Sequence, residues 1–195
     1  MRISYIWLLL LLSIGACKQS KDVNPRFADN PPLEDFVLDE GLEDQIRDNC
    51  VKYLFIHATA SRDGVCWTEA DFNENWKQRG FTRPGYDMAI NPRPQCSIVK
   101  QGVFSCTRSR ETAVWGVSGR DEDGDKYNYV SLHLAWVGGF NGKDERTLYQ
   151  KRFLHGMAQA IKDICPNVIV RGHNEVAAKS CPNFDVSEEF RYLNH

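Results

Sequence analysis

The segment Val51-Lys52-Tyr53-Leu54-Phe55-Ile56-His57 is a nearly continuous apolar run, rich in β-branched and aromatic side chains, that ends in a histidine. A short run of this kind predicts a strand buried within a sheet. The small residues Ala58-Thr59-Ala60-Ser61 follow directly and predict a loop. His57 is therefore expected at the end of a buried strand, where the chain leaves the sheet.

Further elements are predicted on the C-terminal side of this strand. Thr68 and Asp71 have the spacing of a capping box, which predicts a helix over 69–78 that Gly80 ends. Apolar residues at helical spacing predict a second, long helix over 145–164. Strands are predicted over 86–90, 129–137 and 168–170, and a hairpin over 95–106. Strands that alternate with helices predict an α/β fold with a central mixed β-sheet flanked by helices.

Composition and charge limit the class of protein. The chain has 195 residues, of which 42% are hydrophobic, and its five Trp, seven Tyr and ten Phe can fill the core of one domain. The formal net charge is −2, with acidic and basic residues interleaved. This balance argues against a nucleic-acid partner held by bulk charge. We expect a monomer.

The first residues resemble an export signal. Arg2 precedes an apolar run over 6–14, which is too short to span a bilayer, and Gly15-Ala16 then precede Cys17 in a pattern that resembles the bacterial lipobox. We expect a signal peptide over 1–16, a lipid on Cys17, a polar tether over 17–40 and the folded domain over 41–195. The protein would then be exported and anchored by its lipid to a bacterial membrane. Plain secretion with cleavage nearby is the alternative.

The cysteines other than Cys17 suit disulfides in an exported protein, but the sequence leaves their connectivity open. Cys96 and Cys106 flank the predicted hairpin and are the first pair to consider. The acidic segment 121–125 could be taken for a calcium loop, but it lacks the ligand spacing of an EF-hand, so a solvated turn is favoured.

His57, His173 and Cys181 are candidate metal ligands. His57 ends the first strand, whereas His173 and Cys181 lie in the loop after the last strand, so both segments can converge above the edge of the sheet. Two imidazoles and a thiolate suit Zn²⁺, and three protein ligands leave a position for water, whose pKa zinc lowers. Taken alone, each residue has a more ordinary interpretation: a core histidine, or a cysteine that is apolar or disulfide-bonded.

Three segments carry a resemblance to one family. Phe55-Ile56-His57-Ala58-Thr59-Ala60-Ser61 is similar to "IHHTAS" and Gly85-Tyr86-Asp87-Met88-Ala89-Ile90 to "GYHFVI" of the type 2 N-acetylmuramoyl-L-alanine amidases. The run from Gly172 to Asp185 resembles their "GHxEVAPKxCPGFD" loop, most nearly that of the bacteriophage amidase-type lysozymes, and peptidoglycan-recognition proteins share the fold. The resemblance covers about 50–190 and is weak over 92–128.

The resemblance implies roles for individual residues. His57, His173 and Cys181 match the zinc ligands of the family, so 41–195 would be an amidase domain with the zinc site above the sheet edge. Lys179 matches the lysine that stabilises the developing oxyanion, and Tyr86 matches the tyrosine near the attacking water.

The sequence departs from the family pattern at several positions. Asp87 stands where a histidine is usual, and Ala135 stands where some amidases have a catalytic glutamate. His133 replaces a usual glycine and projects to the same side as Ala135, so it has either a structural role or a place along the cleft. Trp115 stands where relatives have a histidine that faces the substrate, and it could form a wall of the substrate groove.

The expected function is zinc-dependent hydrolysis of the amide bond between N-acetylmuramic acid and L-alanine, with peptidoglycan as the partner and Zn²⁺ as the cofactor. Two alternatives stay open. The chain could be a peptidoglycan-binding module without catalysis, or a zinc amidase that acts on another amide.

Overall fold

The computed structural model describes residues 43–44, 46, 51–96, 98–100 and 113–194. Five strands form a single mixed sheet in the order β3-β2-β4-β1-β5. The interior strand β1 (Tyr53–Ala58) pairs in parallel with β4 (Ser131–Trp136) and with β5 (Ile169–Gly172). Next to β4, β2 (Met88–Ile90) is also parallel, whereas the edge strand β3 (Val99–Lys100) is antiparallel to β2. The predicted α/β fold with a central mixed sheet is confirmed.

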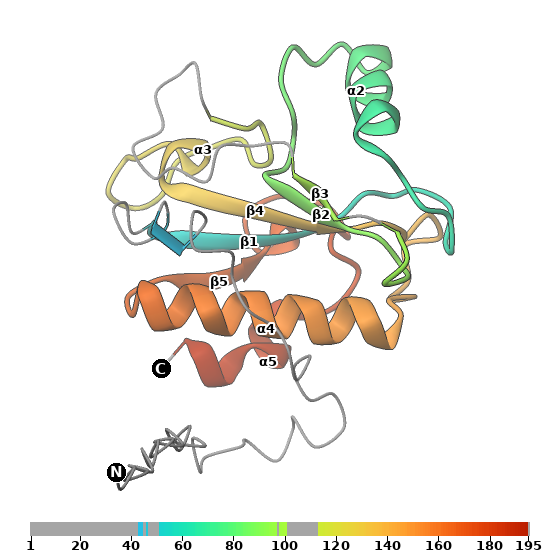
Figure 1. Ribbon diagram of the computed structural model, residues 1–195. Coiled ribbons are helices and arrows are strands. Elements are labelled where there is room, and N and C mark those ends of the chain that lie inside the picture. The colour runs from blue at the N-terminus through green and yellow to red at the C-terminus, as the bar shows by residue number, and fades with distance from the viewer. Residues whose placement is uncertain (1–42, 45, 47–50, 97, 101–112, 195) are drawn as a thin grey trace, which may run out of the picture.

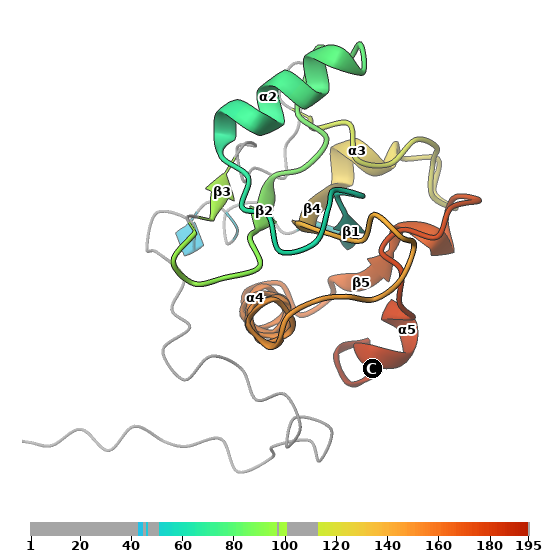
Figure 2. The ribbon, with the colours of Figure 1, turned by 90° about the vertical axis from the view of Figure 1, so that its right-hand side faces the viewer.

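Helices lie on both faces of the sheet (Figures 1 and 2). The long helix α4 (Leu148–Ile164) and the short α5 (Val186–Glu189) lie on one face, and α2 (Glu69–Gln78) and α3 (Tyr127–Val130) lie on the other. The last residues form a 3₁₀ turn, η3 (Arg191–Leu193). Capping boxes set the starts of α2 and α4, with Thr68 and Thr147 as the N-caps.

The side chains of β1 alternate between the two faces, as a strand requires. Leu54, Ile56 and Ala58 belong to the main core, which α4 covers. Phe55 faces the opposite way and packs against Tyr127 of α3. By the same alternation, His57 lies on the face away from α4, and its side chain is buried.

The element boundaries differ from the predictions, most clearly in three places. The strand predicted over 86–90 begins only at Met88. The strand predicted over 129–137 begins at Ser131, because 127–130 form α3. The helix predicted over 145–164 begins at Leu148, because the hydroxyl of Thr147 accepts a hydrogen bond from the Gln150 amide and ends the preceding loop.

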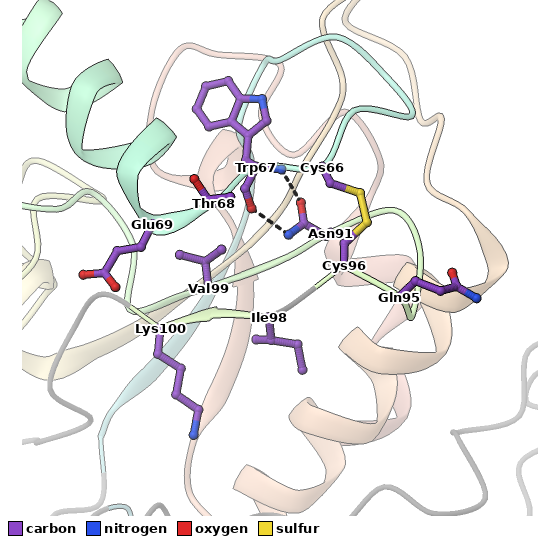
Figure 3. A pocket seen from close by; sticks show the side chains of 10 residues that line it. All are labelled: Cys66, Trp67, Thr68, Glu69, Asn91, Gln95, Cys96, Ile98, Val99 and Lys100. Atoms are coloured by element: carbon purple, nitrogen blue, oxygen red, sulfur yellow. Dashed lines mark hydrogen bonds between the residues drawn. A yellow bond between two sulfur atoms is a disulfide. The ribbon is translucent and has the colours of Figure 1, made fainter.

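The cysteine pairing is a second correction. Cys96 forms a disulfide with Cys66, not with Cys106, which lies outside the described residues. Beside the disulfide in Figure 3, the buried side chain of Asn91 accepts a hydrogen bond from the Trp67 amide and donates one to the Trp67 carbonyl, both at 2.8 Å. This pairing holds the segment before α2 beside the turn after β2, with the two cysteine Cα atoms 6.0 Å apart. Of the predicted hairpin, Val99–Lys100 pairs with β2, and 101–112 lie outside the described residues.

The predicted leader, Cys17 and the tether over 17–40 also lie outside the described residues. Within the described part of the chain, none of the helices has the length and apolar character needed to cross a membrane.

Candidate metal centre

Two parallel strands bring the three predicted ligands to one edge of the sheet. His57 is the penultimate residue of β1, and His173 follows β5 directly, as the first residue of the 3₁₀ turn η2 (His173–Glu175). Cys181 lies in the loop after η2. One nitrogen or sulfur atom from each of the three residues lies within 4.8 Å of the other two. The structure thus brings together His57, His173 and Cys181, which could form a metal site near the sheet.

The ring of His57 has two distinct neighbours. Its Nδ1 lies 3.8 Å from the Cys181 Sγ, and its Nε2 lies 3.0 Å from the Nδ1 of His133. The rings of His57 and His173 meet edge to face, with centroids 4.8 Å apart. His57 therefore turns one ring nitrogen toward the other two candidate ligands and the other nitrogen toward the sheet.

The loop that carries Cys181 is held by hydrogen bonds to two strands and to η2. The Cys181 Sγ accepts from the Ala58 amide at 3.2 Å, and the Cys181 carbonyl accepts from the Asn174 amide at 2.7 Å. The buried indole of Trp136 donates to the carbonyl of Pro182 at 3.1 Å. Because β1 and β4 both anchor the loop, the position of the sulfur follows from the sheet.

Burial controls the protonation of these groups. Burial, followed by the nearby His133, His173 and Lys179, lowers the pKa of His57 well below its ordinary value. Burial and the charge of Lys179 lower the pKa of His173 to about 4. Both imidazoles are thus neutral at physiological pH, and each has a ring nitrogen with a lone pair for a metal.

The thiol of Cys181 responds in the opposite direction. Burial raises its pKa to about 11, although the Ala58 amide and Lys179 act to lower it. A divalent cation would reverse this shift, since a coordinating thiol loses its proton. Two neutral imidazoles and one thiolate form a donor set that suits zinc, so the three residues fit this metal.

Two of the candidate ligands, His173 and Cys181, line a pocket of about 190 Å³. Its charged side chains, Arg79 and Lys179, are both positive, so it favours negative charge that develops within it. Aromatic side chains form much of the wall. The lining residues are Ala58, Thr59, Ala60, Trp76, Arg79, Phe81, Gly85, Tyr86, Trp115, Gly116, His173, Lys179 and Cys181.

Tyr86 lies against the candidate ligands. Its hydroxyl donates to the Ala58 carbonyl at 3.3 Å, and its ring centroid is 5.1 Å from that of His57. Burial and the neighbouring Cys181 raise the pKa of Tyr86, so its hydroxyl stays protonated and can donate a hydrogen bond.

The two candidate groove residues lie in different places. Trp115 lines the pocket, is 45% exposed, and meets Phe81 edge to face. His133 is fully buried behind His57 and does not line the pocket.

Sequence reasoning missed Trp76, Arg79 and Phe81, which all line the pocket. They lie at the C-terminal end of α2 and just beyond it, and the guanidinium of Arg79 lies over both rings, 5.7 Å and 5.2 Å from their centroids. The only sequence signal for these pocket residues was the spacing of two aromatic residues around an arginine at a helix end. It could not show which part of the sheet this helix end faces.

A larger hollow, of about 480 Å³, lies over β3 (Figure 3). Its cysteines, Cys66 and Cys96, are joined in the disulfide, and its ionisable side chains are Glu69 and Lys100. Without a cluster of metal-binding groups, it is a weaker candidate for chemistry than the smaller pocket.

The acidic turn offers a second group of oxygen ligands, from Asp121, Asp123 and Asp125. The ammonium of Lys52 lies 2.6–3.3 Å from all three carboxylates. A protein cation therefore already lies among these carboxylates and offsets part of their negative charge.

The sequence is similar to those of phage endolysins. The endolysin of Enterobacteria phage K11 is 24% identical over 137 residues, which cover 68% of this chain and 81% of the endolysin. The endolysin of Escherichia phage T7 is 24% identical over 140 residues, with the same shares covered. No family model matches the sequence.

These relatives correct the predicted location. The pattern around Cys17 predicted an exported, lipid-anchored protein, but the curated relatives are phage endolysins, which are not lipid-anchored. The prediction of export with a lipid anchor is therefore wrong. It depended on a short apolar run followed by small residues and a cysteine, a local pattern that is independent of the folded domain.

Solved structures show the same fold. The endolysin and N-acetylmuramoyl-L-alanine amidase LysCS from Clostridium intestinale URNW has a TM-score of 0.53 and 22% identity, over 76% of this chain and 86% of LysCS. Bumblebee PGRP-SA has a TM-score of 0.51 and 16% identity, over 72% of this chain and 80% of its own. The chain therefore has the fold of these two structures, one an amidase endolysin and the other a peptidoglycan-recognition protein.

Proposed function

We propose that this protein is a zinc-dependent N-acetylmuramoyl-L-alanine amidase, which hydrolyses the amide bond between N-acetylmuramic acid and L-alanine in peptidoglycan. One observation carries the proposal: His57, His173 and Cys181 converge beside a positively charged pocket. The fold of an amidase-type endolysin supports it.

His57, His173 and Cys181 would hold the zinc ion. Zinc bound by three protein ligands supplies a Lewis acid and lowers the pKa of water to near neutrality. The protein's own contribution is rigid placement of the ligands, because β1 and β5 are paired and Cys181 is tied to β1 by its hydrogen bond from Ala58.

Lys179 and Tyr86 would act on the substrate. The ammonium of Lys179 lines the pocket and would stabilise the negative charge that develops on the amide oxygen. The protonated hydroxyl of Tyr86 would turn from the Ala58 carbonyl and donate its hydrogen bond to an oxygen of the reacting group. Among the residues that line the pocket none is acidic, and Ala135, which pairs with His57 across β1 and β4, carries no carboxylate. Lys179 and Tyr86 would therefore stabilise the developing negative charge without help from a carboxylate.

The substrate would extend past Trp115. This side chain is shared between the site pocket and a second hollow of about 510 Å³, lined also by Arg120, Lys126 and Tyr129. An exposed aromatic between two hollows suits a polymer that continues beyond the bond that is cut.

The test is digestion of purified sacculi by the full-length protein, with the products identified by mass spectrometry. The amidase proposal expects free stem peptides that begin with L-alanine, together with glycan strands that have lost them. Binding to sacculi without new termini would favour a recognition module. Cleavage within glycan strands or within stem peptides would overturn the proposal.

A further inference from the structure

We propose that His133 is a positioning residue that fixes the tautomer and orientation of His57. Only the expected effect on zinc binding rests on the proposed function, because the contact between the two histidines is given by the fold itself. The sequence suggested either a structural role or a place along the cleft for His133, and its position behind His57 points to a more specific task.

The rings of His57 and His133 are in direct contact. The Nε2 of His57 lies 3.0 Å from the Nδ1 of His133, and both side chains are almost fully buried. At this distance one nitrogen donates a proton to the other. Each neutral imidazole carries one donor and one acceptor, so the direction of this hydrogen bond decides the tautomer of both rings.

Metal binding by His57 would set the direction of the hydrogen bond between the two rings. A ring nitrogen that binds a metal must offer a lone pair, and the Nδ1 of His57 is the atom that faces the Cys181 sulfur. His57 must then carry its proton on Nε2 and donate it to His133. A histidine ligand usually donates its other ring proton to a fixed acceptor, and here the acceptor is an imidazole.

Contacts with neighbouring residues hold the ring of His133 in place. Its ring stacks on Phe55, with centroids 5.6 Å apart and an angle of 12° between the planes. On another side, Gly116 leaves the necessary room, because a Cβ at this position would lie only 2.3 Å from the His133 Nδ1. Packing thus restricts the ring that orients His57.

The backbone of His133 is held as well. Its amide donates to a carboxylate oxygen of Asp87 at 2.7 Å, and the Asp87 amide donates to the His133 carbonyl at 2.9 Å. Asp87 is fully buried. Two of the departures from the family pattern, Asp87 and His133, are therefore in direct contact, and together they form the support behind His57.

The first measurement uses the full-length protein stripped of metal by a chelator. Nitrogen-15 NMR of the histidine rings should show the proton of His57 on Nε2 and an unprotonated Nδ1. A proton on Nδ1 would overturn the proposal, regardless of whether the protein binds zinc or hydrolyses peptidoglycan.

The second measurement is zinc affinity by competition with a chelator. His133→Leu removes the acceptor and should weaken zinc binding about 10–100-fold, the usual effect of losing the partner of a metal ligand. His133→Asn places a carbonyl oxygen near the position of Nδ1 and should restore most of the affinity. A folded His133→Leu protein that binds zinc as tightly as wild type would overturn the proposal.

His155→Leu is the matched control, because His155 is also a buried histidine but bonds Tyr192 and Glu189 away from the pocket. It should leave zinc affinity unchanged. If His133→Leu does not fold, the tautomer of His57 in the wild-type protein and the zinc affinity of His133→Asn still test the proposal. Wild-type protein that binds no zinc would refute the proposed metal site, and the tautomer would still test the role of His133.

Discussion

At the scale of single residues, Cys181 is the free cysteine of the described residues and the proposed sulfur ligand. Cys181→Ser replaces a thiol with a hydroxyl of much higher pKa. We expect the purified wild-type protein to hold one zinc ion per chain and the variant to lose tight binding, because a three-ligand site has no ligand to spare. The zinc content per chain of both proteins is measured by metal analysis after dialysis. Full zinc occupancy in the variant would exclude Cys181 as a ligand.

Lys179 gives the second prediction at this scale. Lys179→Ala should keep its zinc but lower kcat on sacculi about 10²–10³-fold, the usual loss when an oxyanion stabiliser is removed. Lys151→Ala is the control, because Lys151 lies on α4, outside the pocket, and it should turn over normally. A wild-type rate in Lys179→Ala would contradict the proposed mechanism even if the metal site is correct.

At the scale of elements, an ionic cluster around the buried guanidinium of Arg146 joins α4 to α5. The guanidinium of Arg146, just before α4, bonds Asp144 and Glu189, and the ring of His155 also bonds Glu189. Burial alone would raise the pKa of Glu189, but hydrogen bonds from His155 and Arg146 outweigh it and lower this pKa to about 2.

This shift predicts how stability depends on pH. The carboxyl of Glu189 would have its ordinary pKa, 4.5, in the unfolded chain and about 2 in the folded one. Its contribution is fully present above pH 4.5 and is lost as the pH falls toward 2, because the unfolded state takes up the proton first. Urea denaturation should therefore show Glu189→Gln less stable than wild type at neutral pH, with the difference shrinking in acid. A constant difference would contradict the shift.

At the scale of the whole molecule, the disulfide between Cys66 and Cys96 closes a loop that contains α2 and β2. Cross-linking two positions 30 residues apart restricts the unfolded chain, so the double variant Cys66→Ser, Cys96→Ser should lose about 2–4 kcal/mol of unfolding free energy. Zinc affinity should change little, because neither cysteine lines the site pocket. Chemical denaturation of the variant and wild type, both kept oxidised, tests the first point. An unchanged midpoint would show that the disulfide contributes little to stability.

Local patterns in the sequence determined most of the elements and the chemistry of the candidate ligands. The apolar run that became β1, the capping boxes of α2 and α4, and the α/β alternation act over a few neighbouring residues, so they can be recognised without a structure. Donor atoms are likewise a property of residue type. Local pattern also misled, at Cys17, where a short motif predicted a lipid anchor.

The tertiary structure alone decided which distant residues meet. Cys66 bonds Cys96 because Asn91 holds their segments together, and the end of α2 completes the pocket because that helix packs on the face of the sheet that also carries His57. His133 meets His57 because β1 and β4 are paired in parallel. These contacts join residues far apart in the chain, and their geometry follows from strand order and packing, which no local pattern contains.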